Sequence, residues 1–302
     1  MSPSYTTPYV ACVTDSFYAR HLGVTLCSLL ENRSENYPVH FLIYADQVTS
    51  QDRDRLVNLI QRYDCPHTFL SLDTERYRSL ATYYHLTQAT YYRTTLPDLL
   101  EEPIQRILYL DCDVIVEEDI RELYNYPLGG KILGAVENPE FDRYHQLNIP
   151  PEHGYFNAGI LLIDVVGWKQ YGASEKIMEL LAGTSGAGPL KFGNQDSFNA
   201  VLHDQWKPLP IRWNVQREMF KAHRKNPQAY PEAANPAIIH YTSSWKPWDY
   251  LNDHPFKDKY FKYLERTPWK NNRATPKDFT PKNVAKKLLR RAGVKSFQKE
   301  YW

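Results

Sequence analysis

The sequence contains no apolar run long enough to cross a membrane. A spanning helix needs about 20 apolar residues, and no stretch of the 302 residues approaches that length. The first residues, MSPSYTTPYVACVTD, also lack a basic segment followed by an apolar one, so they do not resemble a secretory signal peptide. We therefore expect a cytoplasmic protein that is neither exported nor transmembrane.

Cysteine is scarce and has no metal-binding spacing. No C-x-x-C pair occurs, and all four cysteines lie in or beside apolar runs: Cys12, Cys27, Cys65 and Cys112. We expect reduced and mostly buried thiols. A glycine-rich phosphate motif is absent as well, because GTSGAGPLKFG lacks G-x-G-x-x-G spacing and follows a predicted helix. This segment is interpreted as a flexible connection.

Net charge is close to zero. The chain has 36 Lys and Arg against 35 Asp and Glu, a formal charge of +1. Such a weak field does not favour nucleic acid, so we expect no nucleic-acid partner. The distribution is uneven, because residues 281–302 hold seven basic residues and one acid, Glu300, which leaves about −5 for the rest of the chain.

The basic tail also has an apolar face. Val284, Leu288 and Leu289 fall near one side of a predicted helix, and the chain ends KEYW. Basic amphipathic segments with aromatic residues lie on anionic membranes. We predict a peripheral membrane contact through residues 281–302, with a solvated basic tail as the alternative.

Strand and helix patterns alternate along the first half of the chain. Such alternation predicts βαβ units and an α/β fold with a mostly parallel sheet. The predicted strands cover 9–14, 39–45, 67–72 and 106–111, and the predicted helices cover 17–32, 52–63 and 91–100. In the less regular second half we expect strands in 131–138 and 159–165 and helices over 168–181 and 194–205. Residues 207–214 and 237–248 are each expected to form a strand that leads into a loop.

Two carboxylates separated by one residue lie between apolar runs. Asp111 follows ILYL and Asp113 precedes VIV. In open α/β sheets ligands bind beyond the carboxyl ends of the strands, and buried carboxylates need a cation. Mg²⁺ and Mn²⁺ prefer oxygen ligands and often share them with substrate phosphates. We therefore predict a divalent metal site, although a solvated D-x-D loop is possible.

Polar residues in three other segments are candidates for the same site. His240 ends the apolar run AIIH, and an imidazole would favour Mn²⁺ over Mg²⁺. Lys246 follows closely and suits a phosphate, whereas a lone lysine is more often solvated. Small residues after Asn157 allow a ligand to approach the backbone. Three polar residues begin the predicted helix at 194, one of which capping alone would explain: Asn194, Gln195 and Asp196.

Taken in order, four motifs resemble the family 8 retaining glycosyltransferases. They are YLDCDVIV, YFNAGILLID, NQDSFNAVL and IHYTSSWKPW, and the resemblance spans residues 8 to 250. The family includes the bacterial lipopolysaccharide galactosyltransferases and glucosyltransferases. It implies a GT-A fold, here a single Rossmann-like domain at 1–265 with a basic tail at 266–302. It also implies Mn²⁺, with Mg²⁺ as the second choice, and UDP-galactose or UDP-glucose as donor.

The resemblance implies a role for each matching residue. The metal ligands would be Asp111, Asp113 and His240. The nucleotide would meet Val13, Asp15 and the backbone of Cys112, and the diphosphate would meet Ser243 and Lys246. The donor sugar would meet Arg93, Asn138, Asn157, Ala158, Gly159 and Gln195, with Asn194 and Asp196 beside them. Some positions depart from the family: Phe17 often is Asn, Asn138 and Asn194 often are Asp, and Ser243 often is Gly.

The expected reaction transfers a hexose with retention of its anomeric configuration. An amide oxygen carries no full charge, so we favour same-face attack over attack by Gln195, with Asp196 as the alternative nucleophile. The acceptor would be a glycan on lipopolysaccharide, lipid or protein, and residues 138–155 would cover its cleft. Two other functions stay open: a D-x-D phosphohydrolase, which would need a nucleophilic Asp with a Thr-like partner, and a non-catalytic sugar-nucleotide-binding module.

Overall fold

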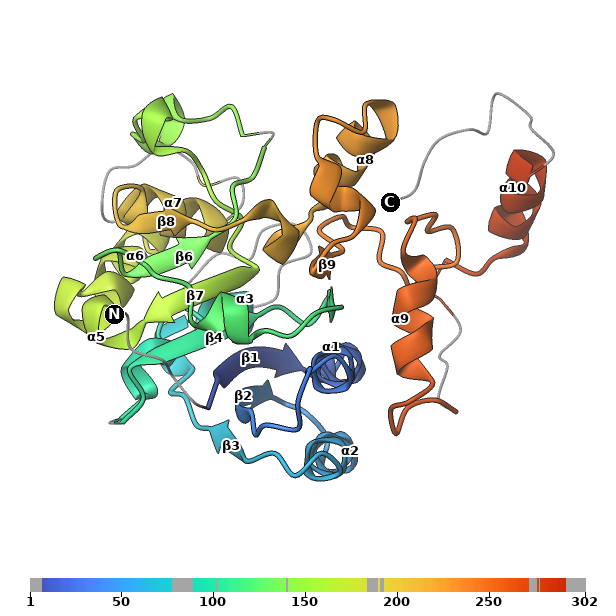
Figure 1. Ribbon diagram of the computed structural model, residues 1–302, viewed down its shortest axis with the longest axis horizontal. Helices are drawn as coiled ribbons and strands as arrows, with labels where there is room; N and C mark the ends of the chain where they lie inside the picture. The colour runs from blue at the N-terminus through green and yellow to red at the C-terminus, as the bar shows by residue number, and fades with distance from the viewer. Residues whose placement is uncertain are drawn as a thin grey trace.

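The computed structural model describes residues 7–77, 89–101, 103–139, 141–183, 190, 193–271, 276 and 278–291. Strand–helix alternation in the first half confirms the predicted α/β fold (Figure 1). Its main elements are β1 (Tyr9–Asp15), α1 (Ala19–Glu31), β2 (His40–Asp46), α2 (Ser50–Gln61), β3 (His67–Leu70), α3 (Ala89–Tyr92), β4 (Arg106–Leu110), β5 (Val114–Val116) and α4 (Arg121–Tyr124).

The second half adds four strands and six helices to the described part of the chain. They are β6 (Leu133–Ala135), β7 (Ile160–Asp164), α5 (Val165–Tyr171), α6 (Ala173–Leu181), α7 (Asn194–Leu202), β8 (Trp206–Pro208), α8 (Arg217–Lys225), β9 (Ile238–His240), α9 (Lys257–Leu264) and α10 (Pro281–Arg291). The expected strand 131–138 is thus limited to its centre.

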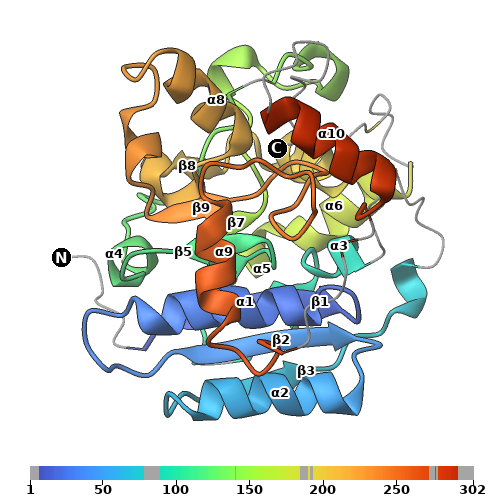
Figure 2. The ribbon, with the colours of Figure 1, turned by 90° about the vertical axis from the view of Figure 1, so that its right-hand side faces the viewer.

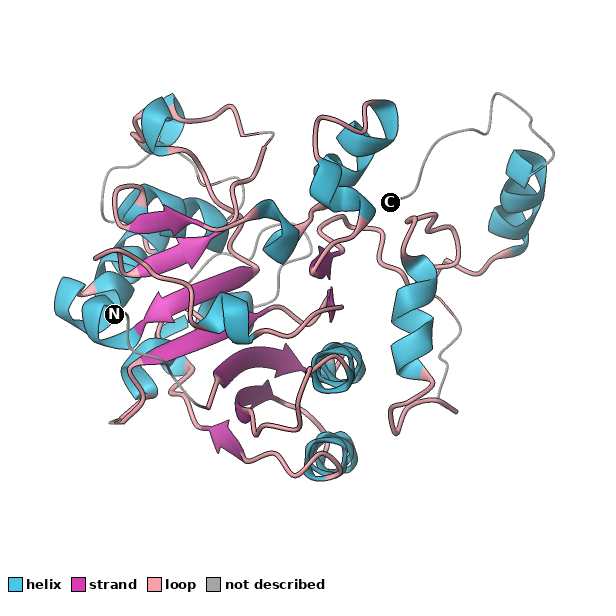
Figure 3. Cartoon of the chain, viewed as in Figure 1, coloured by secondary structure: helices cyan, strands magenta, loops and turns pink. Residues whose placement is uncertain are grey.

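Seven strands form one mostly parallel sheet in the order β3-β2-β1-β4-β7-β6-β8 (Figure 3). Strand β7 runs antiparallel to both of its neighbours, β4 and β6. The other pairings are parallel, as βαβ units require. Because β7 is reversed, it enters the sheet at the edge where β4 ends, which brings the residues before Ile160 to the ligand-binding edge.

Both faces of the sheet are covered by helices. On β1, Val10 and Cys12 pack on one side with α1 and α2, while Ala11 and Val13 pack on the other with α5, α6 and α7. Figures 1 and 2 show α1 and α2 together on one face. Burial on both faces explains why the strands are continuous apolar runs rather than alternating ones. All four cysteines are free and buried, as predicted.

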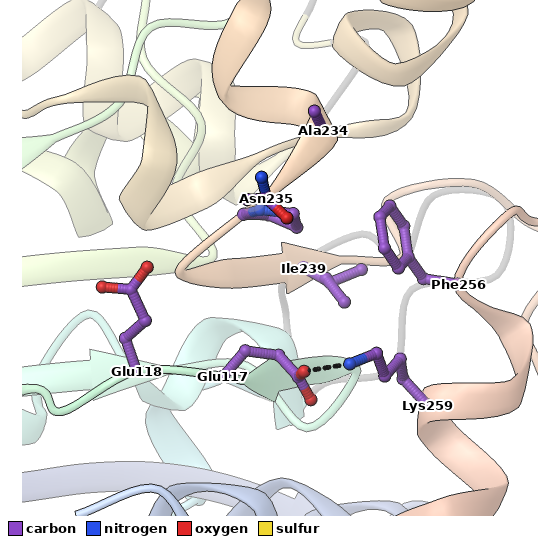
Figure 4. Close-up of a pocket in the computed structure, with 8 residues that line it drawn as sticks. Glu117, Glu118, Ala234, Asn235, Ile239, Phe256 and Lys259 are labelled. Atoms are coloured by element: carbon purple, nitrogen blue, oxygen red, sulfur yellow. Dashed lines mark hydrogen bonds and ion pairs between the residues drawn. The ribbon is translucent and has the colours of Figure 1, made fainter. Parts of the chain in front are cut away.

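A second, two-stranded sheet pairs β5 with β9 antiparallel. Val114 lies opposite His240, so the end of β9 is brought directly beside Asp113. The opposite face of β9 borders a cavity of about 210 Å³ lined by Ile239, Phe256 and an ion pair between Glu117 and Lys259 (Figure 4). This ion pair joins α9 to the end of β5.

Proline sets the limits of two of the predicted elements. In place of a helix over 91–100 there are α3 and a 3-10 helix at Leu96–Leu99. Pro97 has no backbone N–H for an α-helical bond, and it disfavours helical geometry in the residue before it. In 207–214, where we expect a strand leading into a loop, the strand ends at Pro208, and Ile211–Asn214 form a 3-10 helix. Pro208 and Pro210 cannot donate to a strand ladder.

Two glycines change the predicted helices. The helix expected over 168–181 is two helices, α5 and α6, separated at Gly172 with a φ of 66°. Glycine adopts this left-handed conformation without steric cost. Helix α7 is capped by Gly193 rather than by Asn194. The side chain of Asn194 is therefore available for other contacts. Most of the glycine-rich connection before α7 lies outside the described residues.

Helix α10 is amphipathic and docks on the loop before α9. Lys287 Nζ donates to the Tyr250 carbonyl oxygen at 2.5 Å, and Arg290 pairs with Asp253. Leu288 is 59% exposed on this helix and Leu289 39%. Residues 292–302, which complete the predicted tail, lie outside the described part. Among the described helices, none has the length and hydropathy of a membrane span.

Candidate active site

Three chain segments meet at the carboxyl edge of the large sheet. Strand β4 ends at Leu110, which pairs with Ile160 at the start of β7. Asp111 N donates to Gly159 O at 2.8 Å, so the D-x-D and N-A-G segments are in direct contact. The end of β9 completes the group. The structure therefore brings together residues that are up to 129 positions apart in the sequence.

Asp111, Asp113 and His240 form a compact ligand set. One ligand atom from each residue lies within 4.8 Å of the others. His240 Nε2 is 3.4 Å from Asp113 Oδ1 and 4.0 Å from Asp111 Oδ2. No other group of three such residues is found in the described part of the chain.

Hydrogen bonds assign the tautomer of His240. Asn157 Oδ1 accepts from Gly159 N at 3.0 Å and therefore also accepts from Asn214 Nδ2 at 3.0 Å. The remaining amide atom of Asn214, Oδ1, is 3.0 Å from His240 Nδ1. An amide oxygen can only accept, so Nδ1 carries the proton and the lone pair of Nε2 points toward the carboxylates. A metal-ligating histidine needs this arrangement.

Two cations compensate the carboxylates. Arg93 Nη1 lies 3.2 Å from Asp111 Oδ1, and Lys246 Nζ lies 2.6 Å from Asp113 Oδ2. Burial raises the pKa of Asp111, an effect that Arg93 opposes. Burial also acts to raise the pKa of Asp113, but the Lys246 ammonium outweighs it and holds this pKa well below its usual range. Asp113 is thus ionised and ready to bind a cation.

The site fits a divalent metal. Two carboxylates and a neutral imidazole match the ligands of Mn²⁺, and of Mg²⁺ where oxygen dominates. Gly159 keeps the space open, because a Cβ there would lie 2.2 Å from His240 Cε1 and 2.7 Å from Asp111 Oδ2. Only glycine can occupy this position without displacing a ligand.

Arg93 connects the D-x-D segment to α7. It is buried, and its Nη1 also donates to Ala158 O at 2.8 Å. Its Nε donates to Asn194 Oδ1, and Asn194 Nδ2 donates in turn to Thr94 Oγ1 at 2.8 Å. An aspartate at 194 would add a second negative charge near Arg93. Here the uncharged amide of Asn194 takes that position, and both its oxygen and its nitrogen are hydrogen-bonded.

Gln195 lies beside the N-A-G segment. Its Oε1 accepts from Ala158 N at 3.1 Å and from Asn157 Nδ2 at 3.2 Å. Its Nε2 donates to Tyr155 OH at 3.2 Å. The fully buried Asp196 faces Tyr155 and Arg143 instead.

The residues expected at the nucleotide lie at the end of β1. Cys112 Sγ donates to Val13 O at 3.1 Å, which holds the D-x-D turn against this strand. Asp15 Oδ1 accepts from the N–H groups of Phe17 and Tyr18, both at 2.9 Å. This carboxylate therefore also shapes the turn into α1.

The last two predicted residues lie at the margin of the site. Ser243 Oγ forms hydrogen bonds within its own loop, to the N–H and the carbonyl of Trp245, at 2.9 Å each. Asn138 N donates to Tyr155 O at 2.8 Å, next to the N-A-G segment. Ser243 thus shapes its own loop, while Asn138 borders the N-A-G segment.

Four residues in contact with the predicted ones were missed from the sequence. Asn214 orients His240, and Tyr109 OH donates to Asp111 Oδ1 at 2.9 Å. Tyr155 and Arg143 contact Asp196 at 2.7 and 3.1 Å. Tyr155 directly precedes the FNAG motif and was the easiest of the four to predict from the sequence. Tyr109 begins the YLDCDVIV motif and Arg143 lies in the loop expected to cover the acceptor cleft, whereas nothing in the sequence around Asn214 indicates a site.

Comparison with known proteins identifies the family. The model of glycosyl transferase family 8 matches residues 9–252. The chain belongs to glycosyltransferase family 8. For this glycosyltransferase, the match confirms the resemblance carried by the four motifs and does not support the phosphohydrolase alternative.

Bacterial relatives of this family 8 glycosyltransferase cover most of its length. It is 35% identical over 270 residues to General stress protein A of Bacillus subtilis, covering 86% of this chain and 93% of that protein. It is 29% identical to the lipopolysaccharide 1,2-glucosyltransferase of Escherichia coli K12, with 89% and 80% covered. With the lipopolysaccharide 1,3-galactosyltransferase of Salmonella typhimurium the identity is 26%, with 82% and 74% covered.

Solved structures confirm the GT-A fold. The galactosyltransferase LgtC, in complex with donor and acceptor sugar analogues, superposes with a TM-score of 0.76 at 19% identity, covering 90% of this chain and 98% of that one. The apo form of glycosyltransferase GlyE from Streptococcus pneumoniae gives a TM-score of 0.65 at 23% identity, with 86% and 60% covered. The single Rossmann-like sheet is thus common to these proteins.

Proposed function

We propose that this protein is a retaining hexosyltransferase that moves galactose or glucose from a UDP-sugar to a glycan acceptor with the help of Mn²⁺. The observation that carries the proposal is the ligand set Asp111, Asp113 and His240, flanked by Arg93 and Lys246. Relatives named as lipopolysaccharide glucosyltransferases and galactosyltransferases support both hexoses and a lipopolysaccharide-type acceptor.

The donor would lie across the carboxyl edge of the sheet. The uridine would meet Val13, Asp15 and the backbone of Cys112. The diphosphate would meet the metal ligands, Lys246 and the loop at Ser243. The hexose would meet the sugar side, which consists of Arg93, Asn138, Asn157, Ala158, Gly159, Asn194 and Gln195. Gly159 suits such an approach because it has no side chain between the sugar and His240.

Charge development explains the cationic residues. When the glycosyl–phosphate bond breaks, the diphosphate gains negative charge, and groups already aimed at it stabilise the transition state. The Lys246 side chain is flexible, and its ammonium group lies close enough to exchange Asp113 for a phosphate oxygen. A divalent ion, when bound, would act as a Lewis acid on the same oxygens.

Retention through same-face attack fits the surroundings of Asp196. Its Oδ1 accepts from Tyr155 and its Oδ2 pairs with Arg143, and the residue is fully buried. A carboxylate engaged in this way is a weak nucleophile. In same-face attack the leaving phosphate oxygen takes the acceptor proton, so no protein carboxylate is needed.

The membrane contact remains part of the proposal. Leu288, Leu289 and Phe279 are exposed on or beside α10, with exposed fractions of 59%, 39% and 51%. An apolar face within a basic segment suits the anionic inner surface of a membrane. A cytoplasmic enzyme at that surface would meet lipid-linked or lipopolysaccharide acceptors.

The central experiment combines donor binding and turnover. Thermal-shift screening of UDP-galactose and UDP-glucose with Mn²⁺ should reveal the donor, since a ligand stabilises the folded state in proportion to its affinity. Excess chelator should abolish transfer, and Mn²⁺ should restore it better than Ca²⁺. NMR of the product would report the anomeric configuration.

Matched variants separate the site from general stability. Asp113→Asn should remove metal-dependent transfer while the protein stays folded. The control is Asp119→Asn, which removes a carboxylate held by Ser34, Tyr37 and Arg121 away from the site. The control should retain transfer. Full activity in excess chelator would rule out the metal-dependent mechanism.

A further inference from the structure

A row of hydrogen-bonded side chains runs behind Gln195. Arg143 Nη1 lies 3.1 Å from Asp196 Oδ2, and Asp196 Oδ1 accepts from Tyr155 OH at 2.7 Å. The hydroxyl oxygen of Tyr155 accepts from Gln195 Nε2 at 3.2 Å. The row thus joins the segment before β7 to the first turn of α7.

The direction of every bond in this row follows from its two ends. At one end, the Asp196 carboxylate is paired with Arg143 and accepts, so the Tyr155 hydroxyl donates to Asp196 and its oxygen must accept from the amide. Burial, with Asp196 beside it, raises the pKa of Tyr155 well above its usual value, so the hydroxyl keeps its proton at neutral pH. At the other end, the backbone N–H of Ala158 only donates, which requires the oxygen of Gln195 to face it.

These constraints define what the amide can offer a substrate. Gln195 Oε1 already accepts two hydrogen bonds, from Ala158 N and from Asn157 Nδ2. A carbonyl oxygen has two lone pairs and the NH₂ group has two donors. One donor is used by Tyr155. The second N–H of Nε2 is the group that remains for the ligand.

Arg143 and Phe141 hold the row in place from one loop. Asp196 and Tyr155 are both fully buried, and a buried carboxylate without a cation is strongly destabilising. Arg143, with 16% of its side chain exposed, supplies that charge. The ring of Phe141 stacks on that of Tyr155 with centroids 3.5 Å apart and planes 4° apart. The phenol ring therefore has little freedom to turn away from Gln195.

We propose that Tyr155, Asp196 and Arg143 are positioning residues that orient Gln195 so that its Nε2–H, and not its oxygen, faces the donor sugar. The inference rests on the proposed transferase function. It assigns Asp196 a role without covalent chemistry and makes Gln195 a hydrogen-bond donor in the transition state. Residues 141–155 then control the catalytic amide as well as the rim of the site.

The first test is Tyr155→Phe, which keeps the ring and removes the hydroxyl. We expect kcat to fall roughly 10- to 100-fold, as for other supporting hydrogen bonds around a reactive group. KM for the donor and the affinity for UDP should change less than about threefold, because the contact acts on the transition state. The matched control is Tyr124→Phe, whose buried hydroxyl donates to Arg106 O at 2.8 Å. It should lower Tm and leave kcat unchanged.

A double-variant cycle distinguishes positioning from covalent catalysis. Residues that act as one unit are not additive. Tyr155→Phe combined with Asp196→Asn should therefore lose no more kcat than the more impaired single variant. If Asp196 were the nucleophile, Asp196→Asn would be far more impaired than Tyr155→Phe, and a glycosyl adduct on Asp196 would be detectable by mass spectrometry. Multiplicative losses or such an adduct would overturn the inference.

Arg143 provides a second measurement, because it lies at the partly exposed end of the row. Arg143→Lys retains the charge and should retain most of kcat, whereas Arg143→Met should resemble Tyr155→Phe. Wild-type kcat in both Tyr155→Phe and Arg143→Met would disprove the positioning role. Absence of turnover in the wild-type protein with every UDP-hexose and Mn²⁺ would instead disprove the proposed function.

Discussion

At the scale of single residues, we expect Lys246 to control how readily the site accepts a cation. Its ammonium group lies 2.6 Å from Asp113 Oδ2 and also donates to Tyr241 O at 2.6 Å. The ammonium group thus neutralises the Asp113 carboxylate that a metal ion must bind. On the proposed mechanism, the same ammonium moves to the diphosphate when the donor binds.

Lys246→Met should therefore have opposite effects on two ligands. Without nucleotide, Mn²⁺ affinity should rise about tenfold, equivalent to roughly 1.4 kcal/mol, because an ammonium no longer competes for Asp113. UDP affinity in the presence of Mn²⁺ should fall, because a phosphate partner is lost. Isothermal titration calorimetry measures both.

The matched control for this prediction is Lys259→Met. Lys259 pairs with Glu117 at the cavity on the other face of β9 (Figure 4). Its removal should change neither affinity. Equal Mn²⁺ affinities in wild type and Lys246→Met would contradict the competition between lysine and metal.

At the scale of elements, the reversed direction of β7 builds the site. Because β7 starts where β4 ends, its first residues pass directly behind the metal ligands. The chain can approach this closely only at a glycine: a Cβ on Gly159 would lie 2.2 Å from His240 Cε1. The N-A-G segment is therefore part of the wall of the metal site as well as of the proposed sugar side.

Gly159→Ala should weaken Mn²⁺ binding at least tenfold, because the added methyl group displaces His240 or Asp111. Its control is Gly23→Ala on α1, whose Cβ would lie 2.4 Å from Trp269 Cζ3 and not against a metal ligand. Overpacking there should cost about 1–3 kcal/mol of stability without changing Mn²⁺ affinity. Titration of Mn²⁺ into each folded variant makes the comparison. Unchanged affinity in Gly159→Ala would show that the ligands move without cost.

At the scale of the whole molecule, a buried histidine makes stability depend on pH. Burial lowers the pKa of His254 to about 3, and the side chain is only 5% exposed. Its Nδ1 accepts from Phe256 N at 3.1 Å. Below the unfolded-state pKa of about 6.5 the unfolded chain binds a proton that the folded state does not. Stability from this group is therefore complete above that pH and is lost as the pH falls toward 3.

The predicted slope is about 1.4 kcal/mol per pH unit for this one group. His254→Gln retains an acceptor for Phe256 N and does not titrate. The difference in unfolding free energy between wild type and variant should thus shift by about 2 kcal/mol between pH 6.5 and pH 5. Urea denaturation at both pH values measures it. Parallel pH curves would mean that His254 is protonated in the folded state.

The proposed membrane contact of the basic tail also belongs to the molecular scale, and it rests on α10. Deleting residues 281–302 would remove the contact of Lys287 with Tyr250 as well as the exposed leucines of α10. The double variant Leu288→Asn and Leu289→Asn is a cleaner test, because both side chains are substantially exposed. It should transfer to a soluble acceptor normally and bind anionic vesicles more weakly.

Vesicle co-sedimentation at low and high salt tests this surface. Each Lys or Arg near an anionic membrane contributes about 1 kcal/mol, and salt screens that share. Wild-type binding should fall with salt but persist through the leucines, and the variant should lose the persistent share. Equal sedimentation of both proteins would make α10 a solvated helix.

Much of the fold was predictable because its signals are local. Apolar runs and helical spacing identified β1, α1, β2, α2 and β4, and Asp111 and Asp113 were placed correctly at a strand end. The failures were local as well: Pro97 and Gly172 interrupted helices that hydrophobic spacing alone extended. Proline and glycine act on the backbone, whereas the apolar pattern reports only side-chain burial.

The sequence by itself determined the alternation of strands and helices and the chemical types at the site, since these depend on neighbours along the chain. Only the tertiary structure decided that β7 is reversed, that Asn214 orients His240 and that Arg143 and Tyr155 hold Asp196. Tyr155 and Asp196 are 41 positions apart, and Asn214 and His240 are 26 apart. Partners at such separations meet through strand order and packing, and no periodicity in the sequence encodes them.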